Sequence, residues 1–306
     1  MPDAPRPISR VLPLLRLLRP AQWIKNIVLF APFFFSLWNA KAGFADGTYT
    51  ALAFCGILRE FLAFCALSSA VYIFNDIVDA PRDRLHPRKR FRPIASGEIP
   101  VREAWPYALA LLVAAVLLHG SAPGLSILAA YLGLQVLYTF LLKKVPVLDV
   151  VCIALGFVLR VLAGGAACAV VPSPWILSCT FFLALFLALC KRRQERAELG
   201  ESADTRPALR GLSLRALDTL VYASAGVTLL SYAAYTQAPA TIANFGSRGL
   251  ILTLPFVALG IARYIVLLHR RNETERPERV LLTDLPLLAI ILLFGLSVAA
   301  VFLILK

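Results

Sequence analysis

The chain has 306 residues, of which 59% are hydrophobic and only 16% are charged, and its formal net charge is +13 at pH 7. A typical soluble domain has about 25% charged residues, and a domain of this length could not bury so much apolar surface in one core. Disorder requires low hydrophobicity and is excluded as well. The composition predicts a polytopic membrane protein and gives no reason to expect a nucleic-acid partner.

Nine apolar segments approach the ~20 residues with which an α-helix crosses a bilayer. Short links join the fourth, fifth and sixth segments, as expected for helical hairpins within one domain. We therefore expect an all-α polytopic membrane protein with nine transmembrane helices in a single intramembrane domain over residues 1–306. The segments are, in chain order, 24–38, 50–74, 105–119, 124–142, 147–171, 174–190, 216–237, 249–269 and 283–305.

Basic residues predict the orientation of these helices. With the N-terminus inside, most of the 31 Lys and Arg residues fall on the inside, whereas Lys41, Arg248 and Lys306 fall outside. The positive-inside rule therefore places the N-terminus inside and the C-terminus outside. Residues 8–22 contain no cleavable signal pattern and predict an interfacial helix on the inner leaflet. The expected location is a bacterial inner membrane.

Polar residues concentrate in two inside connections, 75–104 and 191–215, while the outer connections are short and nearly neutral. A transporter or lipid-phosphate carrier usually has polar groups at mid-membrane. The observed distribution favours an enzyme whose active site faces the cytoplasm.

An acidic motif with the sequence NDIVDAPRD opens the first of these connections. If the second span continues as a helix, Asp76, Asp79 and Asp83 stand at i, i+3 and i+7 on one face, although Pro81 could end or kink it. Carboxylate and amide oxygens suit Mg²⁺, so we expect these acids and Asn75 to bind the metal. The alternative is a solvated polar cap that pairs with arginines.

A basic cluster lies within and after this motif, at Arg82, Arg88, Lys89, Arg90 and Arg92. Alone, the cluster could anchor the chain to lipid headgroups. Beside a Mg²⁺ motif it favours phosphate binding, because arginine offers bidentate geometry and lysine a point charge.

Polar side chains at four other spans complete the candidate substrate site. They are Gln22, Lys25 and Asn26 at span one, Tyr138 and Lys143 after span four, Asp149 and Arg160 in span five, and Lys191, Arg192, Glu195 and Glu198 after span six. Lys25 could instead form an interfacial anchor with Trp23. Arg160 lies within a span and needs an anion, either a lipid phosphate or an ion pair with Asp149, Asp218 or Glu60.

Four stretches resemble the UbiA superfamily of intramembrane prenyltransferases and, within it, the decaprenyl-phosphate phosphoribosyltransferases. They are RPAQWIKN, SAVYIFNDIVDAPRDRLHPRKRFRPIASG, FVLRVLAGGAA and KRRQERAEL, between about residues 19 and 200. The resemblance implies a UbiA-like bundle of nine helices whose acidic motif, with Asn75, Asp76, Asp79 and Asp83, binds Mg²⁺ and a diphosphate. The three aspartates and Lys191, from the basic stretch after span six, are the expected catalytic residues.

The resemblance also implies transfer of the phosphoribosyl group of 5-phosphoribosyl diphosphate (PRPP) to a polyprenyl phosphate. The product would serve as a precursor of cell-wall arabinan. In-line attack would invert the configuration at the ribose C1. The length of the lipid chain stays open, and a homo-oligomer is compatible with the sequence.

One departure from the wider family separates two branches. Aromatic prenyltransferases have a second acidic motif after span six, whereas KRRQERAEL is mostly basic. Basic side chains suit the additional phosphates of PRPP and of the lipid, so the phosphoribosyl reading is favoured over an aromatic prenyltransferase. Glu195 and Glu198 could orient these cations, bind ribose hydroxyls or cap a helix.

Overall fold

The computed structural model describes residues 8–37, 47–85, 89–119, 122–200, 207–270, 280 and 282–304, and within them every regular element is a helix. The α-helices are α1 (Ile8–Leu18), α2 (Ala31–Ser36), α3 (Gly47–Asp83), α4 (Val101–Leu118), α5 (Ala122–Phe140), α6 (Leu148–Ala167), α7 (Pro174–Leu199), α8 (Leu214–Gln237), α9 (Pro239–Phe245), α10 (Leu254–Arg270) and α12 (Leu285–Ile304). The 3-10 helices are η1 (Pro20–Phe30), η2 (Lys89–Phe91), η3 (Leu142–Lys144), η5 (Pro207–Leu209) and η6 (Gly249–Thr253).

The all-α class is thus confirmed, and helical elements cover most of each predicted apolar segment. Six helices of the described chain are long and apolar enough to cross a membrane by length and composition: Thr50–Asp83, Val101–Leu118, Leu148–Ala167, Pro174–Glu198, Gly249–Arg270 and Leu285–Ile304. The apolar part of α5, Gly124–Phe140, is shorter. The count of nine spans therefore stays a prediction.

Several predicted boundaries were wrong. The N-terminal helix ends at Leu18 rather than at residue 22, because Arg19 adopts a left-handed conformation (φ 52°) and Pro20 then begins η1. The first apolar segment is not one α-helix, since η1 precedes α2. The predicted connections 75–104 and 191–215 are shorter, because α3 continues through Asp83 and α7 through Leu199.

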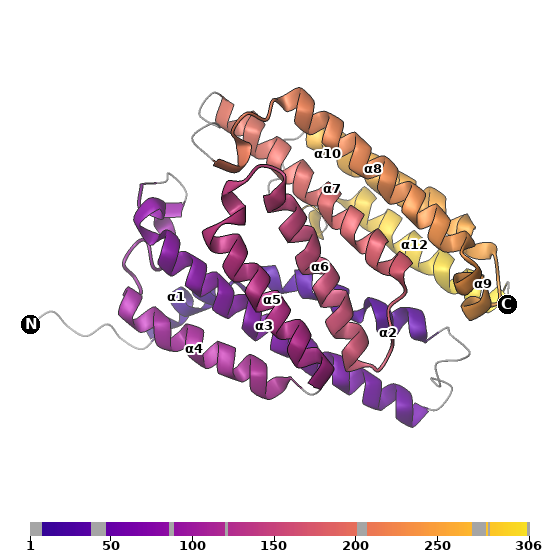
Figure 1. Ribbon diagram of the computed structural model, residues 1–306, viewed down its shortest axis with the longest axis horizontal. Coiled ribbons are helices and arrows are strands. Elements are labelled where there is room, and N and C mark those ends of the chain that lie inside the picture. Colours follow the sequence, from indigo (N-terminus) through magenta and orange to yellow (C-terminus); the bar gives the residue numbers. More distant parts are fainter. Residues whose placement is uncertain are drawn as a thin grey trace, which may run out of the picture.

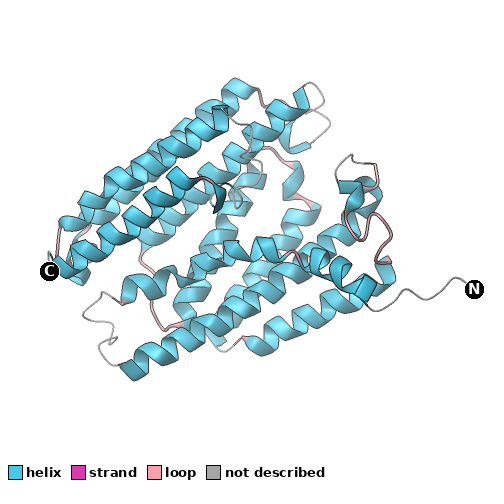
Figure 2. Cartoon of the chain, turned by 180° about the vertical axis from the view of Figure 1, so that it is seen from behind, coloured by secondary structure: helices cyan, strands magenta, loops and turns pink. Residues whose placement is uncertain are grey.

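The helices form a bundle in which α3 and α4 lie on one side, α8, α10 and α12 on the other, and α5, α6 and α7 between them (Figure 1). The view from behind shows the same helical architecture (Figure 2). In the bundle α3 packs on α4, α6 on α5 and α7, and α7 on α8. Both η1 and α2 contact α3 and α6, so this irregular segment joins the helix of the acidic motif to the helix of Arg160.

The core that supports this junction is an apolar cluster of η1, α3, α5 and α6. It contains Leu29, Phe64, Tyr131 and Ala163, each at most 1% exposed. Gly164 lets the backbone of η1 approach α6, because a Cβ there would overlap the Leu29 carbonyl. Large apolar side chains such as Leu117, Leu230 and Leu303 are exposed on the outside of the bundle. An apolar outer surface is what lipid contact requires.

Candidate active site

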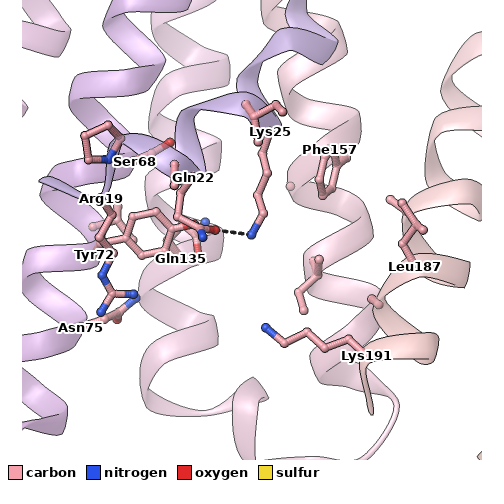
Figure 3. Close-up of a pocket in the computed structure, with 18 of the residues that line it drawn as sticks. Arg19, Gln22, Lys25, Ser68, Tyr72, Asn75, Gln135, Phe157, Leu187 and Lys191 are labelled. Atoms are coloured by element: carbon pink, nitrogen blue, oxygen red, sulfur yellow. Dashed lines mark hydrogen bonds between the residues drawn. The ribbon is translucent and has the colours of Figure 1, made fainter. Parts of the chain in front are cut away.

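A cavity of about 1870 Å³ opens among α1, η1, α3, α5, α6, α7 and α12. Twelve of the predicted site residues line it: Gln22, Lys25, Asn75, Asp76, Lys89, Arg92, Tyr138, Arg160, Lys191, Arg192, Glu195 and Glu198. Figure 3 shows Lys25 from η1 and Lys191 from α7 extending their side chains into this space. The structure therefore brings together residues that are up to 176 positions apart in the chain, from Gln22 to Glu198.

Other predicted residues do not line this cavity. They are Asn26, Asp79, Arg82, Asp83, Arg90, Lys143 and Asp149. Arg88, the remaining candidate, lies outside the described residues.

Asp76 is the acidic centre of the cavity and is only 3% exposed. Arg19 Nη2 donates to both of its carboxylate oxygens, at 2.5 and 2.6 Å, and Arg92 Nη1 donates to Oδ1 at 3.0 Å. The Arg19 guanidinium also lies over the ring of Tyr72, 5.1 Å from its centroid. Arg19 was missed as a site residue by the sequence analysis, although it opens the quoted stretch RPAQWIKN. Its left-handed backbone directs the chain from α1 into η1 beside α3.

Asp83 and Asp76 converge on one cation. Arg92 Nη1 lies 2.6 Å from Asp83 Oδ2 and 3.0 Å from Asp76 Oδ1. Two carboxylates seven residues apart thus point to a single position that a positive charge occupies. Hard oxygen donors that converge in this way fit Mg²⁺. No group of three or more acidic, Cys or His side chains forms a ready-made metal cage in the part of the chain that the structure describes.

Asp79 lies in a second, smaller hollow of about 190 Å³ that Arg82 and Lys143 also line. Lys143 Nζ donates to Asp79 Oδ1 and Oδ2, at 2.8 and 3.1 Å. The helix continues through Pro81, as the motif required. Asp76 lines the main cavity and Asp79 lines the smaller hollow, whereas Asp83 lines neither. In this arrangement the carboxylates pair with cations from different elements, so a metal site shared by all three stays a prediction.

The amide of Asn75 lies at the edge of the main cavity and accepts a hydrogen bond from Thr139 Oγ1 at 2.5 Å. Thr139 belongs to α5 and is 2% exposed. This bond ties the acidic helix to α5. Thr139 carried no signal in the sequence, since it is a single hydroxyl in an apolar segment.

On α7, Arg192 is buried between two acids. Its Nε lies 2.5 Å from Asp149 Oδ2 and its Nη1 lies 2.6 Å from Glu195 Oε2. Glu198 accepts a hydrogen bond from Gln194 Nε2 at 3.1 Å. Arg192 therefore holds α6 and α7 together, whereas Lys191, one residue earlier, extends toward the middle of the cavity (Figure 3).

The polar residues of η1 differ in their surroundings. Lys25 Nζ donates to Gln22 Oε1 at 2.5 Å, and both side chains line the cavity. Asn26 is fully buried and accepts a hydrogen bond from Arg160 Nε at 2.8 Å. Trp23 Nε1 donates to Ser69 Oγ at 3.0 Å, so Trp23 is fastened to α3. Lys25 is thus a cavity residue, and Asn26 is a support for Arg160.

None of the expected ion pairs forms at Arg160. The three acids have other basic partners: Asp149 pairs with Arg192, Asp218 with Arg193, and Glu60 with His119. Arg160 instead bonds to Asn26, to the Gly156 carbonyl and to the Tyr131 hydroxyl. The alternative of a structural ion pair is wrong for the described carboxylates.

Taken together, the lining of the cavity is strongly basic. Its basic side chains are Arg16, Arg19, Lys25, Lys89, Arg92, Arg160, Lys191 and Arg192, and its acidic ones are Asp76, Glu195 and Glu198. Apolar residues such as Ile24, Leu187 and Ile291 line the rest. A cavity with this lining accommodates a ligand that is anionic at one end and apolar at the other.

Several known proteins are similar to this chain in sequence. Relatives named decaprenyl-phosphate phosphoribosyltransferase are 38% identical over 187 residues in Corynebacterium glutamicum and 37% identical over 197 residues in Mycolicibacterium smegmatis. These matches cover 60% and 63% of this chain, but only 54% and 60% of the relatives' own lengths. The nodulation protein NoeC of Azorhizobium caulinodans is 29% identical over 298 residues, which is 93% of this chain and 91% of that protein.

Solved structures and a family model agree on the fold. The structure of a UbiA homolog from Archaeoglobus fulgidus, bound to GPP and Mg²⁺, superposes with a TM-score of 0.68 at 22% identity and covers 95% of this chain and 99% of that one. The model of the UbiA prenyltransferase family matches residues 29–285, which is most of the chain. The chain therefore belongs to the UbiA prenyltransferase family.

Proposed function

We propose that this protein transfers the 5-phosphoribosyl group of PRPP to a polyprenyl phosphate and releases diphosphate. The names of the relatives support this choice of reaction within the family. The matched regions cover less than two thirds of those proteins. The proposed reaction therefore rests on the residues of the cavity as well as on the sequence similarity.

The basic lining of the cavity is the observation that carries the proposal. An aromatic prenyltransferase, the other candidate within the family, has one diphosphate to neutralise. PRPP and a lipid phosphate together bring a diphosphate and two phosphomonoesters. Lysine and arginine side chains on three separate elements, such as Lys25, Arg92 and Lys191, match several phosphate groups better than one.

Asp76, Asp83 and the amide of Asn75 would hold Mg²⁺, with Asp79 as a further candidate after a local rearrangement. When bound, the metal would neutralise charge on the diphosphate leaving group. Arg19 and Arg92 already lie beside Asp76 and would then bind phosphate oxygens. Lys25 and Lys191 would hold the donor with its C1 facing the acceptor.

The acceptor phosphate needs no strong general base, because it is anionic near neutral pH. Catalysis would rest on positioning and on electrostatic stabilisation. Attack from the face opposite to the diphosphate would invert C1 and give a β-linked product from α-PRPP. The polyprenyl tail would lie along the apolar part of the cavity, at residues such as Leu187 and Ile291.

The same reaction fits a topology of nine spans in a bacterial inner membrane, with the N-terminus and the cavity mouth on the cytoplasmic side, in one domain over residues 1–306. The basic connections support this side, since PRPP is a cytosolic metabolite and the positive-inside rule places such connections there.

Incubation of the purified protein with PRPP, MgCl₂ and farnesyl phosphate, with lipid product and diphosphate both measured, tests the proposal. We expect a phosphoribosylated lipid and equimolar diphosphate. Diphosphate release from geranyl diphosphate with an aromatic acceptor, and none from PRPP, would replace the proposal by the prenyltransferase reading. Transfer of lipid phosphate across liposomes without any diphosphate release would replace it by a carrier.

A further inference from the structure

Arg160 is a buried arginine in a membrane-spanning helix, and all the hydrogen-bond partners of its side chain are uncharged. It is 6% exposed and stands at the thirteenth position of α6, which begins at Leu148. Nε donates to Asn26 Oδ1 at 2.8 Å, Nη1 to the Gly156 carbonyl at 3.0 Å, and Nη2 to the Tyr131 hydroxyl at 2.7 Å. Its guanidinium also lies over the Tyr131 and Phe157 rings, 4.9 and 5.3 Å from their centroids. The side chain is therefore held rigidly, but its charge is not neutralised by these contacts.

Other arginines of the bundle show the contrast. Arg192, Arg193 and Arg263 pair with Asp149, Asp218 and Asp284, respectively. No described carboxylate forms an ion pair with Arg160, and the acids that could have done so bind other cations. An arginine within the membrane that lacks a protein counter-ion is costly and typically faces a bound anion or a polar cavity. Arg160 lines the main cavity.

The groups around Arg160 offer donors to that cavity. The Tyr131 oxygen accepts hydrogen bonds from Arg160 Nη2 and, at 2.8 Å, from Gln135 Nε2. With both lone pairs engaged, the Tyr131 hydroxyl has its own hydrogen left to donate. Neither this hydrogen nor the remaining N–H groups of Arg160 meet an acceptor among the described residues. Tyr131 is 1% exposed, so an unmatched donor there carries a desolvation cost that an anionic ligand would remove.

We propose that Arg160, Tyr131 and Gln135 form a phosphate-binding subsite at the deep end of the cavity, separate from the acidic motif. The inference rests on the proposed function, in which PRPP carries a 5-phosphate besides its diphosphate and the lipid acceptor carries a phosphate of its own. Asn26, which supports Arg160, contacts Ser68 of α3, eight residues before Asp76. At 1.5 Å per residue, Ser68 lies about 12 Å from Asp76 along the axis of α3, so the subsite is set apart from the acidic motif. A second phosphate of the reacting pair is therefore held at the far side of the ribose from the acidic motif.

The ligand of this subsite is the phosphate of the polyprenyl acceptor or the 5-phosphate of PRPP, which share one chemistry. Binding and kinetics with Arg160→Gln distinguish the two sources. Farnesyl phosphate and ribose 5-phosphate serve as probes, and binding is followed by the shift in melting temperature of the purified protein. Arg59→Gln is the matched control, because Arg59 is an exposed arginine of a spanning helix that does not line the cavity.

Arg160→Gln should weaken the binding of one probe by about 10- to 100-fold, as expected for the loss of a charged hydrogen-bonding partner. It should raise the KM of the matching substrate and leave the KM of the other unchanged, while Arg59→Gln behaves as wild type. A loss confined to farnesyl phosphate assigns the subsite to the acceptor, and a loss confined to ribose 5-phosphate and PRPP assigns it to the donor. Tyr131→Phe removes one donor and keeps the ring, so it should show the same selectivity with a smaller loss even if Arg160→Gln fails to fold.

Unchanged affinity for both probes in the Arg160→Gln and Tyr131→Phe variants would overturn the subsite while the phosphoribosyl transfer of the wild type stands. Conversely, a wild-type protein that binds farnesyl phosphate through Arg160 but releases no diphosphate from PRPP would retain the subsite and overturn the proposed function.

Discussion

A Cβ atom on Gly164 of α6 would overlap the carbonyl oxygen of Leu29 in η1. The two backbones are thus in direct contact at a position where only hydrogen fits. The same close approach keeps Asn26, three residues before Leu29, beside Arg160. The position of η1 against α6, and of every polar side chain that η1 contributes, depends on this glycine.

Gly164→Ala should therefore lower the stability of the protein. The added methyl group forces η1 away from α6, and overpacking of this kind costs about 1–3 kcal/mol. We expect a melting temperature in detergent that is lower by several degrees. Gly133→Ala on α5 is the matched control, because a Cβ there meets no atom within 4 Å. Equal melting temperatures for the two variants would show that η1 can move away from α6 without a loss of stability.

Asp76→Asn and Asp79→Asn should both lower turnover by about 100-fold or more, since each removes a proposed metal ligand. Their stabilities should differ. Asp76→Asn removes the buried carboxylate that pairs with Arg19, leaves Arg92 paired with Asp83 alone, and should lower the melting temperature. The Asp79–Lys143 pair is partly exposed and contributes about 0–1 kcal/mol, so Asp79→Asn should melt as wild type does.

EDTA tests the metal assignment independently of these substitutions. Chelation should abolish the transfer activity of the wild type, and added MgCl₂ should restore it. Full activity of a metal-stripped enzyme in EDTA would exclude Mg²⁺ from the reaction and leave the acidic motif as a group of ion pairs.

Lys191→Ala and Arg192→Ala alter adjacent residues with different roles. Lys191 extends into the cavity, so its loss should raise the KM for PRPP about tenfold without changing the melting temperature. Loss of Arg192 removes the buried cation that pairs with both Asp149 and Glu195 and should cost about 3–5 kcal/mol of stability. Equal kinetic effects with unchanged stability in both variants would mean that Arg192 is a substrate ligand rather than a brace between helices.

Cysteine labelling in intact bacteria tests the proposed topology. Arg248 and Arg210 are exposed and lie in connections predicted to face opposite sides of the membrane. In a Cys55→Ser background, which removes the exposed native thiol, an impermeant maleimide should label Arg248→Cys and spare Arg210→Cys. Labelling of Arg210→Cys alone would reverse the orientation and place the cavity mouth outside the cell.

Amino-acid composition and local sequence pattern were sufficient to predict those structural features that depend on a single segment of the chain. The apolar runs gave the helices, and the spacing of Asp76, Asp79 and Asp83 indicated that α3 continues through the motif. Lys25 and Lys191 were identified because cations beside an acidic motif suit phosphate. These inferences need only helix periodicity and the chemistry of the side chains.

Contacts between distant segments could not be predicted in this way. The pairing of Arg19 with Asp76 joins residues 57 positions apart and depends on how η1 packs. The placement of Asp79 in a separate hollow depends on Lys143 of η3, which follows α5. The partners around a helix decide which cavity each of its faces borders. Tyr131 gave no signal, since a tyrosine in an apolar segment is usually a core residue.

The 3-10 winding of η1 has a mechanical consequence. Its 11 residues rise about 2.0 Å each and extend about 22 Å, whereas an α-helix of the same length would extend about 16 Å. Conversion to α-helical winding would therefore shorten the segment by about one helical turn and rotate its side chains relative to one another. Gly164 anchors one end of η1 and Asp76, through Arg19, anchors the other. The 3-10 winding thus sets the distance between the two anchored ends of η1. That distance in turn determines how far Lys25 reaches into the cavity.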